Sequence, residues 1–122
     1  MKKEKKATEI IDLYIEYADI EGKSKLEGDY KTGNKMVKKI NKLSEPFNSN
    51  LNLAQEVLNA LMDSSSIRAR TLAACKALRL GIIISKSLET LEQISKRNDI
   101  GILSFSAGMA LKIWNEKGHL DP

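Results

Sequence analysis

Hydrophobic residues recur at helical spacing along most of this chain, and the pattern predicts six α-helices. A helix presents the same face every three or four residues, so apolar side chains at i, i+3, i+4 and i+7 indicate one buried side. Glycine, proline and short polar clusters separate the apolar segments. We expect helices over about residues 8–21, 29–45, 52–62, 66–80, 87–94 and 102–117.

Residues that favour helix ends support these boundaries. Thr8, Asp29 and Ser87 are expected N-caps, because their side-chain oxygens can accept a hydrogen bond from the first turn. The polar run 63–66 supplies caps for the fourth helix, and Gly22 is expected to end the first.

The β-branched run 82–84 also fits a buried strand. We favour a helix after it, because apolar residues follow at helical spacing as Leu88, Leu91 and Ile94.

The spacing also predicts which residues face the core. In the first two helices we expect Ile11, Tyr14, Ile15, Ala18, Tyr30, Gly33, Val37 and Ile40. In the third and fourth helices we expect Ala54, Val57, Leu58, Leu61, Ala69, Ala73, Ala74 and Ala77. In the sixth we expect Ile102, Phe105, Met109, Ala110, Ile113 and Trp114.

A repeat with an offset of 33 residues relates the third and fourth helices to the fifth and sixth. The matched pairs are Leu58 with Leu91, Leu61 with Ile94, Ile67 with Ile100, Ala74 with Ala107, Ala77 with Ala110 and Leu78 with Leu111. Such a period is typical of stacked helix pairs, each with an apolar face too wide to bury alone. We expect one all-α domain over residues 1–122, with residues 1–6 a disordered basic tail.

Composition fits a soluble protein. Of the 122 residues 42% are hydrophobic and 30% charged, and no apolar run approaches the roughly 20 residues of a membrane span. The lysine-rich start leads into a segment with Glu9 and Asp12, so it lacks the apolar core of a signal peptide. The single cysteine, Cys75, suits a reducing compartment. We expect a cytoplasmic protein with no membrane partner.

Three segments carry a resemblance to a known family: 28–35 (GDYKTGNK), 69–78 (ARTLAACKAL) and 107–114 (AGMALKIW). In this order they resemble a small bacterial HEAT-like domain, family two-zero-one-nine of the domain-of-unknown-function series. The resemblance implies a HEAT/armadillo-like right-handed stack of about three helical hairpins. Related small helical-repeat proteins look like immunity proteins that neutralise secreted toxins, so it also implies a protein partner.

Lysines gather on one face of the second expected helix. They are Lys31, Lys35, Lys38, Lys39 and Lys42, in a chain of net charge +4. Their spacing places them opposite the apolar stripe. Such a face can bind an acidic protein or nucleic-acid phosphates, or it can simply be solvated, which we favour. Aromatic residues for stacking on bases are only 5% of the chain.

Arg68 and Arg70, at the start of the fourth helix, are the other candidate partner-binding residues. Arginine is enriched among residues that dominate protein interfaces. The HEAT-like resemblance implies instead an ion pair with an acid in the preceding turn, where Asp63 is the local partner. We favour the structural role for Arg70 and give the two roles of Arg68 equal weight.

Catalytic chemistry is not predicted. His119 is the only histidine and lies in the tail, and Cys75 lies in the alanine-rich helix, where a thiol usually packs as a small hydrophobic group. We find no glycine-rich phosphate loop and no carboxylate beside aromatic groups, as HEAT-like DNA glycosylases need. We therefore expect no catalytic, cofactor-binding or metal-binding residues and no cofactor.

We predict a non-enzymatic protein–protein interaction module, immunity-like in neutralising a bacterial toxin. The alternative is a nucleic-acid-binding helical-repeat protein that uses the lysines of the second helix.

Overall fold

The computed structural model describes residues 5–120, and within them the chain forms six α-helices, one short 3-10 helix and no strand. The elements are α1 (Ala7–Glu27), α2 (Tyr30–Ser44), η1 (Glu45–Asn48), α3 (Leu51–Met62), α4 (Ile67–Leu80), α5 (Ile84–Ser95) and α6 (Ile102–Lys117). The all-α prediction is confirmed for this part of the chain. Of the predicted disordered tail, residues 1–4 lie outside the described residues. No helix over 5–120 is both long and apolar enough to cross a membrane.

Two of the predicted helix N-caps are confirmed. Asp29 accepts a hydrogen bond from the Thr32 N–H at 3.2 Å, and Ser66 accepts one from the Ala69 N–H at 3.1 Å. The predicted caps at Thr8 and Ser87 are wrong. Both residues lie inside helices, and the Ser87 hydroxyl donates to the Ile83 carbonyl of the preceding turn at 2.7 Å.

The prediction that Gly22 ends the first helix is also wrong, because α1 continues to Glu27. Gly28 ends it instead, with a φ of 73° in the left-handed region that glycine tolerates. At Gly22 the helix α1 comes close to α4, since a Cβ at this position would lie 3.2 Å from the Cβ and Cγ of Arg68 on α4. The helix therefore ends about 1.7 turns later than the glycine suggested.

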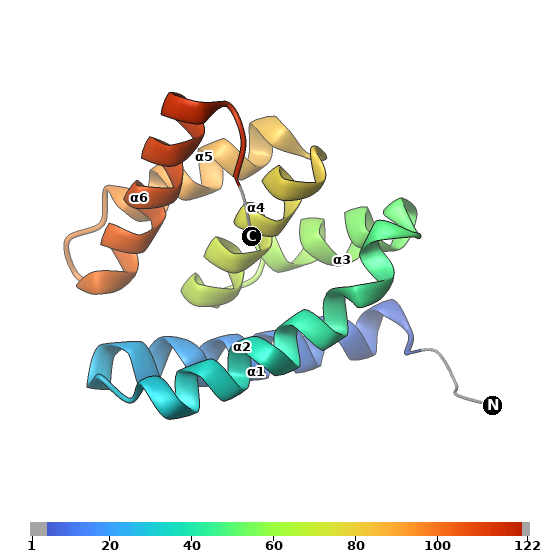
Figure 1. Cartoon of the computed structure of the whole chain (residues 1–122), viewed down its shortest axis with the longest axis horizontal. Coiled ribbons are helices and arrows are strands. Elements are labelled where there is room, and N and C mark those ends of the chain that lie inside the picture. The colour runs from blue at the N-terminus through green and yellow to red at the C-terminus, as the bar shows by residue number, and fades with distance from the viewer. Residues whose placement is uncertain (1–4, 121–122) are drawn as a thin grey trace.

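Helix α4 lies at the centre of the molecule and contacts α1, α3, α5 and α6 (Figure 1). Its four small residues, Ala69, Ala73, Ala74 and Ala77, are completely buried, as predicted. Small side chains let neighbouring helices approach closely, which explains how one helix packs against four others. The antiparallel pair α1 and α2 forms a layer below it in the view of Figure 1, with α5 and α6 above.

The predicted inward face of α3 is confirmed, since Ala54, Val57, Leu58 and Leu61 are all fully buried. The face of α2 was predicted only in part. Ile40 is buried as expected, but Tyr30 is 75% and Val37 38% exposed, and Met36 and Leu43 are buried instead. Helix α2 packs against α1 and η1, so neighbours cover one side of it and its first turn projects beyond them. In α1 the buried stripe is Ile10, Tyr14 and Ala18, with Ile11 and Ile15 only half-buried.

Candidate functional site

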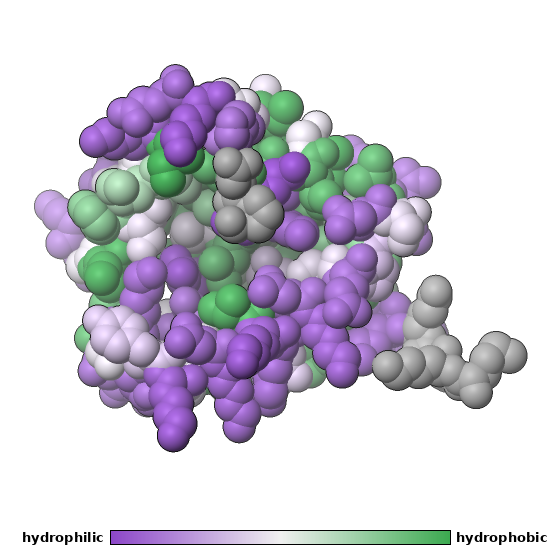
Figure 2. Space-filling view, viewed as in Figure 1, coloured by the Kyte–Doolittle hydropathy of each residue, from purple (hydrophilic) through white to green (hydrophobic). Residues whose placement is uncertain are grey.

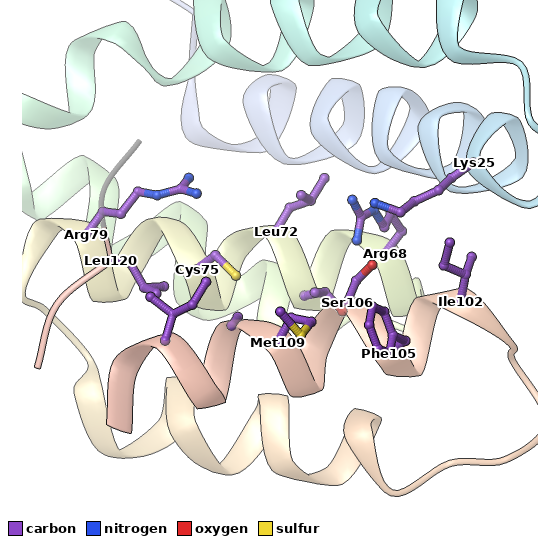
Figure 3. A pocket seen from close by; sticks show the side chains of 13 residues that line it. Lys25, Arg68, Leu72, Cys75, Arg79, Ile102, Phe105, Ser106, Met109 and Leu120 are labelled. Atoms are coloured by element: carbon purple, nitrogen blue, oxygen red, sulfur yellow. The ribbon is translucent and has the colours of Figure 1, made fainter. Parts of the chain in front are cut away.

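An open groove of about 450 Å³ lies between α4 and α6, with the last turns of α1 at its rim (Figure 3). Its floor comes from α4, through Arg68, Thr71, Leu72, Cys75 and Arg79. Leu120, which follows α6, also lines the groove. Its wall comes from α6, through Ile102, Phe105, Ser106, Met109, Ala110 and Ile113. Both sets follow helical spacing, so each presents one face of its helix to the groove.

The wall exposes large apolar side chains. Ile102, Phe105 and Met109 are 43%, 65% and 40% exposed, although the sequence predicted them to be buried. A different side of α6 packs inward, where Leu103 and Ala107 are buried. Figure 2 shows this side of the molecule hollowed between α6 and the α1–α2 layer, with hydrophobic surface along α6. An apolar strip of this kind is a common mark of an interaction site.

The charged side chains that line the groove are all basic over the described residues. They are Lys25, Arg68 and Arg79. Lys25 and Arg68 point toward one another near one end, and Arg79 lies toward the other (Figure 3). The groove is therefore apolar along its middle and positive at both ends.

Arg68 is held by a buried ion pair with Glu21 of α1. Its Nε lies 2.5 Å from Oε1 and a terminal nitrogen donates to Oε2 at 3.2 Å, with both side chains about 90% buried, at 10% and 9% exposed. The prediction that Asp63 pairs with this arginine is wrong, because Asp63 forms an ion pair with Lys86 at 2.8 Å. Glu21 lies next to Gly22, at the point where α1 comes close to α4.

Arg70 lies outside the groove. It lines a polar cleft between α4 and α5, and its terminal nitrogen donates to Oε1 of Gln93 at 3.3 Å. Among residues 5–120 its Nε is the one buried side-chain nitrogen or oxygen without a hydrogen-bond partner. The structure thus separates the two arginines that the sequence grouped together.

The five lysines of α2 form a separate surface, which we call the lysine face: Lys31, Lys35, Lys38, Lys39 and Lys42. All are exposed, and none forms an ion pair with another described residue. At about 100° per residue they occupy roughly a 100° arc of the helix. The Lys39 ammonium lies 5.2 Å from the centre of the Tyr17 ring, a cation–π contact. Figure 2 shows hydrophilic surface over this helix.

Cys75 lies half-buried on the groove floor. Burial raises the pKa of its thiol, while the charges of Arg79 and Arg68 act in the opposite direction. The net effect keeps the thiol protonated at neutral pH, unlike an activated nucleophile. The two arginines nevertheless place positive potential at the floor. Over residues 5–120, no three His, Cys, Asp or Glu side chains form a potential metal site.

Sequence reasoning missed two groove residues, Lys25 and Arg79. Lys25 lies beyond Gly22, the expected end of the first helix, but within α1 of the structure. Arg79 had a usable signal: it lies 11 positions after Arg68, which returns to the same face of a helix after about three turns.

Comparison of the chain with protein-family models, curated proteins and solved structures finds no match. The resemblance to the HEAT-like family therefore stays a prediction.

Proposed function

We propose that the chain is a non-enzymatic protein-interaction module whose partner docks in the groove between α4 and α6. The observation that carries this proposal is the exposure of Ile102, Phe105 and Met109 on one face of α6. Removing apolar surface from water contributes about 25 cal/mol per Å², so covering three such side chains favours a complex. Aromatic residues, methionine and arginine are also the types enriched at interfaces.

We also propose that the helices belong to a HEAT/armadillo-like right-handed stack. In support, α3 and α5 both span 12 residues and start 33 positions apart, at Leu51 and Ile84. The matched pairs Leu58–Leu91 and Leu61–Ile94 are buried alike. In such a stack the second helix of each pair lines one surface. The shared lining of the groove by α4 and α6 fits that scheme.

The positive ends of the groove favour an acidic partner, and a secreted toxin neutralised by one-to-one binding is the partner class that we propose. Such a complex blocks its partner sterically and requires no chemistry from the groove. The protonated Cys75 thiol fits this passive role.

The test is copurification from the native host, with the wild type compared with Phe105→Asp. The control is Leu51→Asp, which places the same charge on a similarly exposed apolar residue, 49% exposed, at the start of α3. Both variants should stay folded, because surface substitutions usually change stability by about 0.5 kcal/mol or less. We expect a stoichiometric partner with the wild type and the control, and at least a tenfold loss with Phe105→Asp. Equal recovery of the same partner by all three proteins would refute the docking site.

A second candidate function is nucleic-acid binding, favoured by the five exposed lysines without ion pairs to described residues. If all five contact phosphates, the log–log salt dependence of duplex binding should have a slope of about −4 to −5. Fluorescence anisotropy with a labelled duplex and a labelled single strand measures this. The double variant Lys35→Glu with Lys39→Glu should abolish binding, whereas Arg79→Glu should leave most of it. Absence of binding at low salt would end this alternative.

A further inference from the structure

We infer that the groove accepts an acidic amphipathic α-helix of about three turns, with carboxylates near both of its ends. This inference rests on the proposed function and names the chemistry of the docking partner.

The length of the groove sets the length of the occupant. The apolar wall runs from Ile102 to Ile113, and the floor runs from Arg68 to Arg79. Each span covers 12 residues of helix, with about 16.5 Å between its first and last residues at 1.5 Å per residue. A partner helix lying along the groove therefore makes contact over about three turns, enough for anchors at i, i+3, i+4 and i+7.

The charge of the groove sets the charge of the occupant. At one end Arg68 is paired with the Glu21 carboxylate, whereas Lys25 forms no ion pair with a described residue, which leaves one positive charge in excess. At the other end Arg79 is exposed on α4. Acidic side chains near both ends of the occupant would meet these cations, and its apolar middle would cover Leu72, Phe105 and Met109.

The hydrogen-bonding requirements of the occupant's backbone favour a helix over an extended strand. The groove is lined by two helices, whose backbone N–H and C=O groups bond within the helix and offer no ladder to a strand. A strand pressed against Phe105 and Met109 would leave backbone groups without partners, at a cost in free energy. A helix satisfies its own backbone and presents only side chains.

The test uses two synthetic 18-residue helical peptides with alanine backgrounds. Both carry leucine at four positions spaced i, i+3, i+4 and i+7. One has glutamate flanking this stripe at both ends, and its twin has lysine at the same positions. Binding to the full chain is measured by isothermal titration calorimetry, and amide chemical-shift changes in NMR spectra locate the site.

We expect the acidic peptide to bind at least tenfold more tightly than its basic twin and to shift α4 and α6 resonances. Arg79→Glu should abolish most of the preference between the two peptides, because one end of the groove then becomes negative while the other stays positive. Lys38→Glu, which makes the same charge change on the lysine face, should leave it unaltered. If Lys38→Glu alters the preference as much as Arg79→Glu does, the preference reflects net charge. That result would overturn the inference.

Three other results would also overturn it. Equal binding of both peptides would mean that charge does not select the occupant. Absence of binding by either would exclude a helix of this kind, and the proposed function would still stand if Phe105→Asp releases the native partner. A dimer seen by sedimentation, and dissociated by Phe105→Asp, would make a second copy of the chain the occupant.

Discussion

The ion pair between Glu21 and Arg68 joins α1 to α4 and fixes one end of the groove floor. Burying two charges carries a large desolvation cost, which the two hydrogen bonds and the close approach of the charges offset. Gly22 is part of the same arrangement, because a Cβ there would lie 3.2 Å from the Arg68 Cβ and Cγ, closer than an ordinary contact. A residue that looked like a helix end is therefore a packing residue.

Removing one partner of this pair should be far more damaging than removing a surface pair. We predict that Arg68→Ala lowers the free energy of unfolding by about 3 kcal/mol, because the Glu21 carboxylate is left buried without its partner. Urea denaturation followed by circular dichroism measures the change. Lys96→Ala, at the exposed pair with Glu92, should cost less than about 1 kcal/mol. Similar losses for both variants would contradict the structural role of Arg68.

Cys75 gives a second prediction at this scale, concerning pH. Because burial raises the pKa of the thiol, less thiolate is present at any given pH than in an unfolded chain. The alkylation rate by iodoacetamide should therefore reach half its maximum above the usual pKa of about 8.5. Arg79→Glu should move the midpoint higher still, since it removes a charge that favours the thiolate. A midpoint pH below that of the urea-unfolded chain would mean that folding lowers the pKa of the thiol, which would contradict this prediction.

At the scale of elements, central helices were predicted well and peripheral ones poorly. Helix α4 has neighbours on several sides, so its pattern of alanines was compatible with only one interpretation. Helices α2 and α6 have more apolar positions than their neighbours cover, as Tyr30, Val37 and Phe105 show. Periodicity gives the existence of such a helix but not its rotation, because the tertiary arrangement decides which side is covered.

The same reasoning explains how much of the candidate site was visible in the sequence. The lysine face follows from spacing alone, since an exposed helix face depends on one element. The groove depends on where α6 lies relative to α4, which no local pattern encodes, and on the extension of α1 to Gly28, whose signal competes with that of Gly22.

Two helical glycines provide a matched prediction for the elements. Alanine is the better helix former at both Gly22 and Gly33, by roughly 0.5–1 kcal/mol. At Gly33 a Cβ would lie 3.7 Å from the Ser24 Cβ, an ordinary contact, so Gly33→Ala should raise the melting temperature. At Gly22 a Cβ would lie 3.2 Å from two Arg68 carbons, so Gly22→Ala should lower it. Calorimetry measures the melting temperature of both variants. Equal stabilisation by the two substitutions would contradict the close approach of α1 and α4.

At the scale of the whole molecule, α1 connects two distinct surfaces. It contacts α2, whose outer side carries the lysine face, and it contacts α4 and α6, which form the groove. The lysines of α2 do not line the groove, so a substitution on one surface leaves the side chains of the other in place. The two proposed functions can therefore be separated by charge reversals that change net charge equally.

The central claim is that a protein partner occupies the groove between α4 and α6, and Cys75 on its floor reports directly on occupancy. The measurement is the alkylation rate of Cys75 in the purified complex and in the free chain at the same pH, followed by mass spectrometry. We expect a rate at least tenfold lower in the complex. An unchanged rate in a stoichiometric complex would mean that the partner binds elsewhere, and would contradict the account.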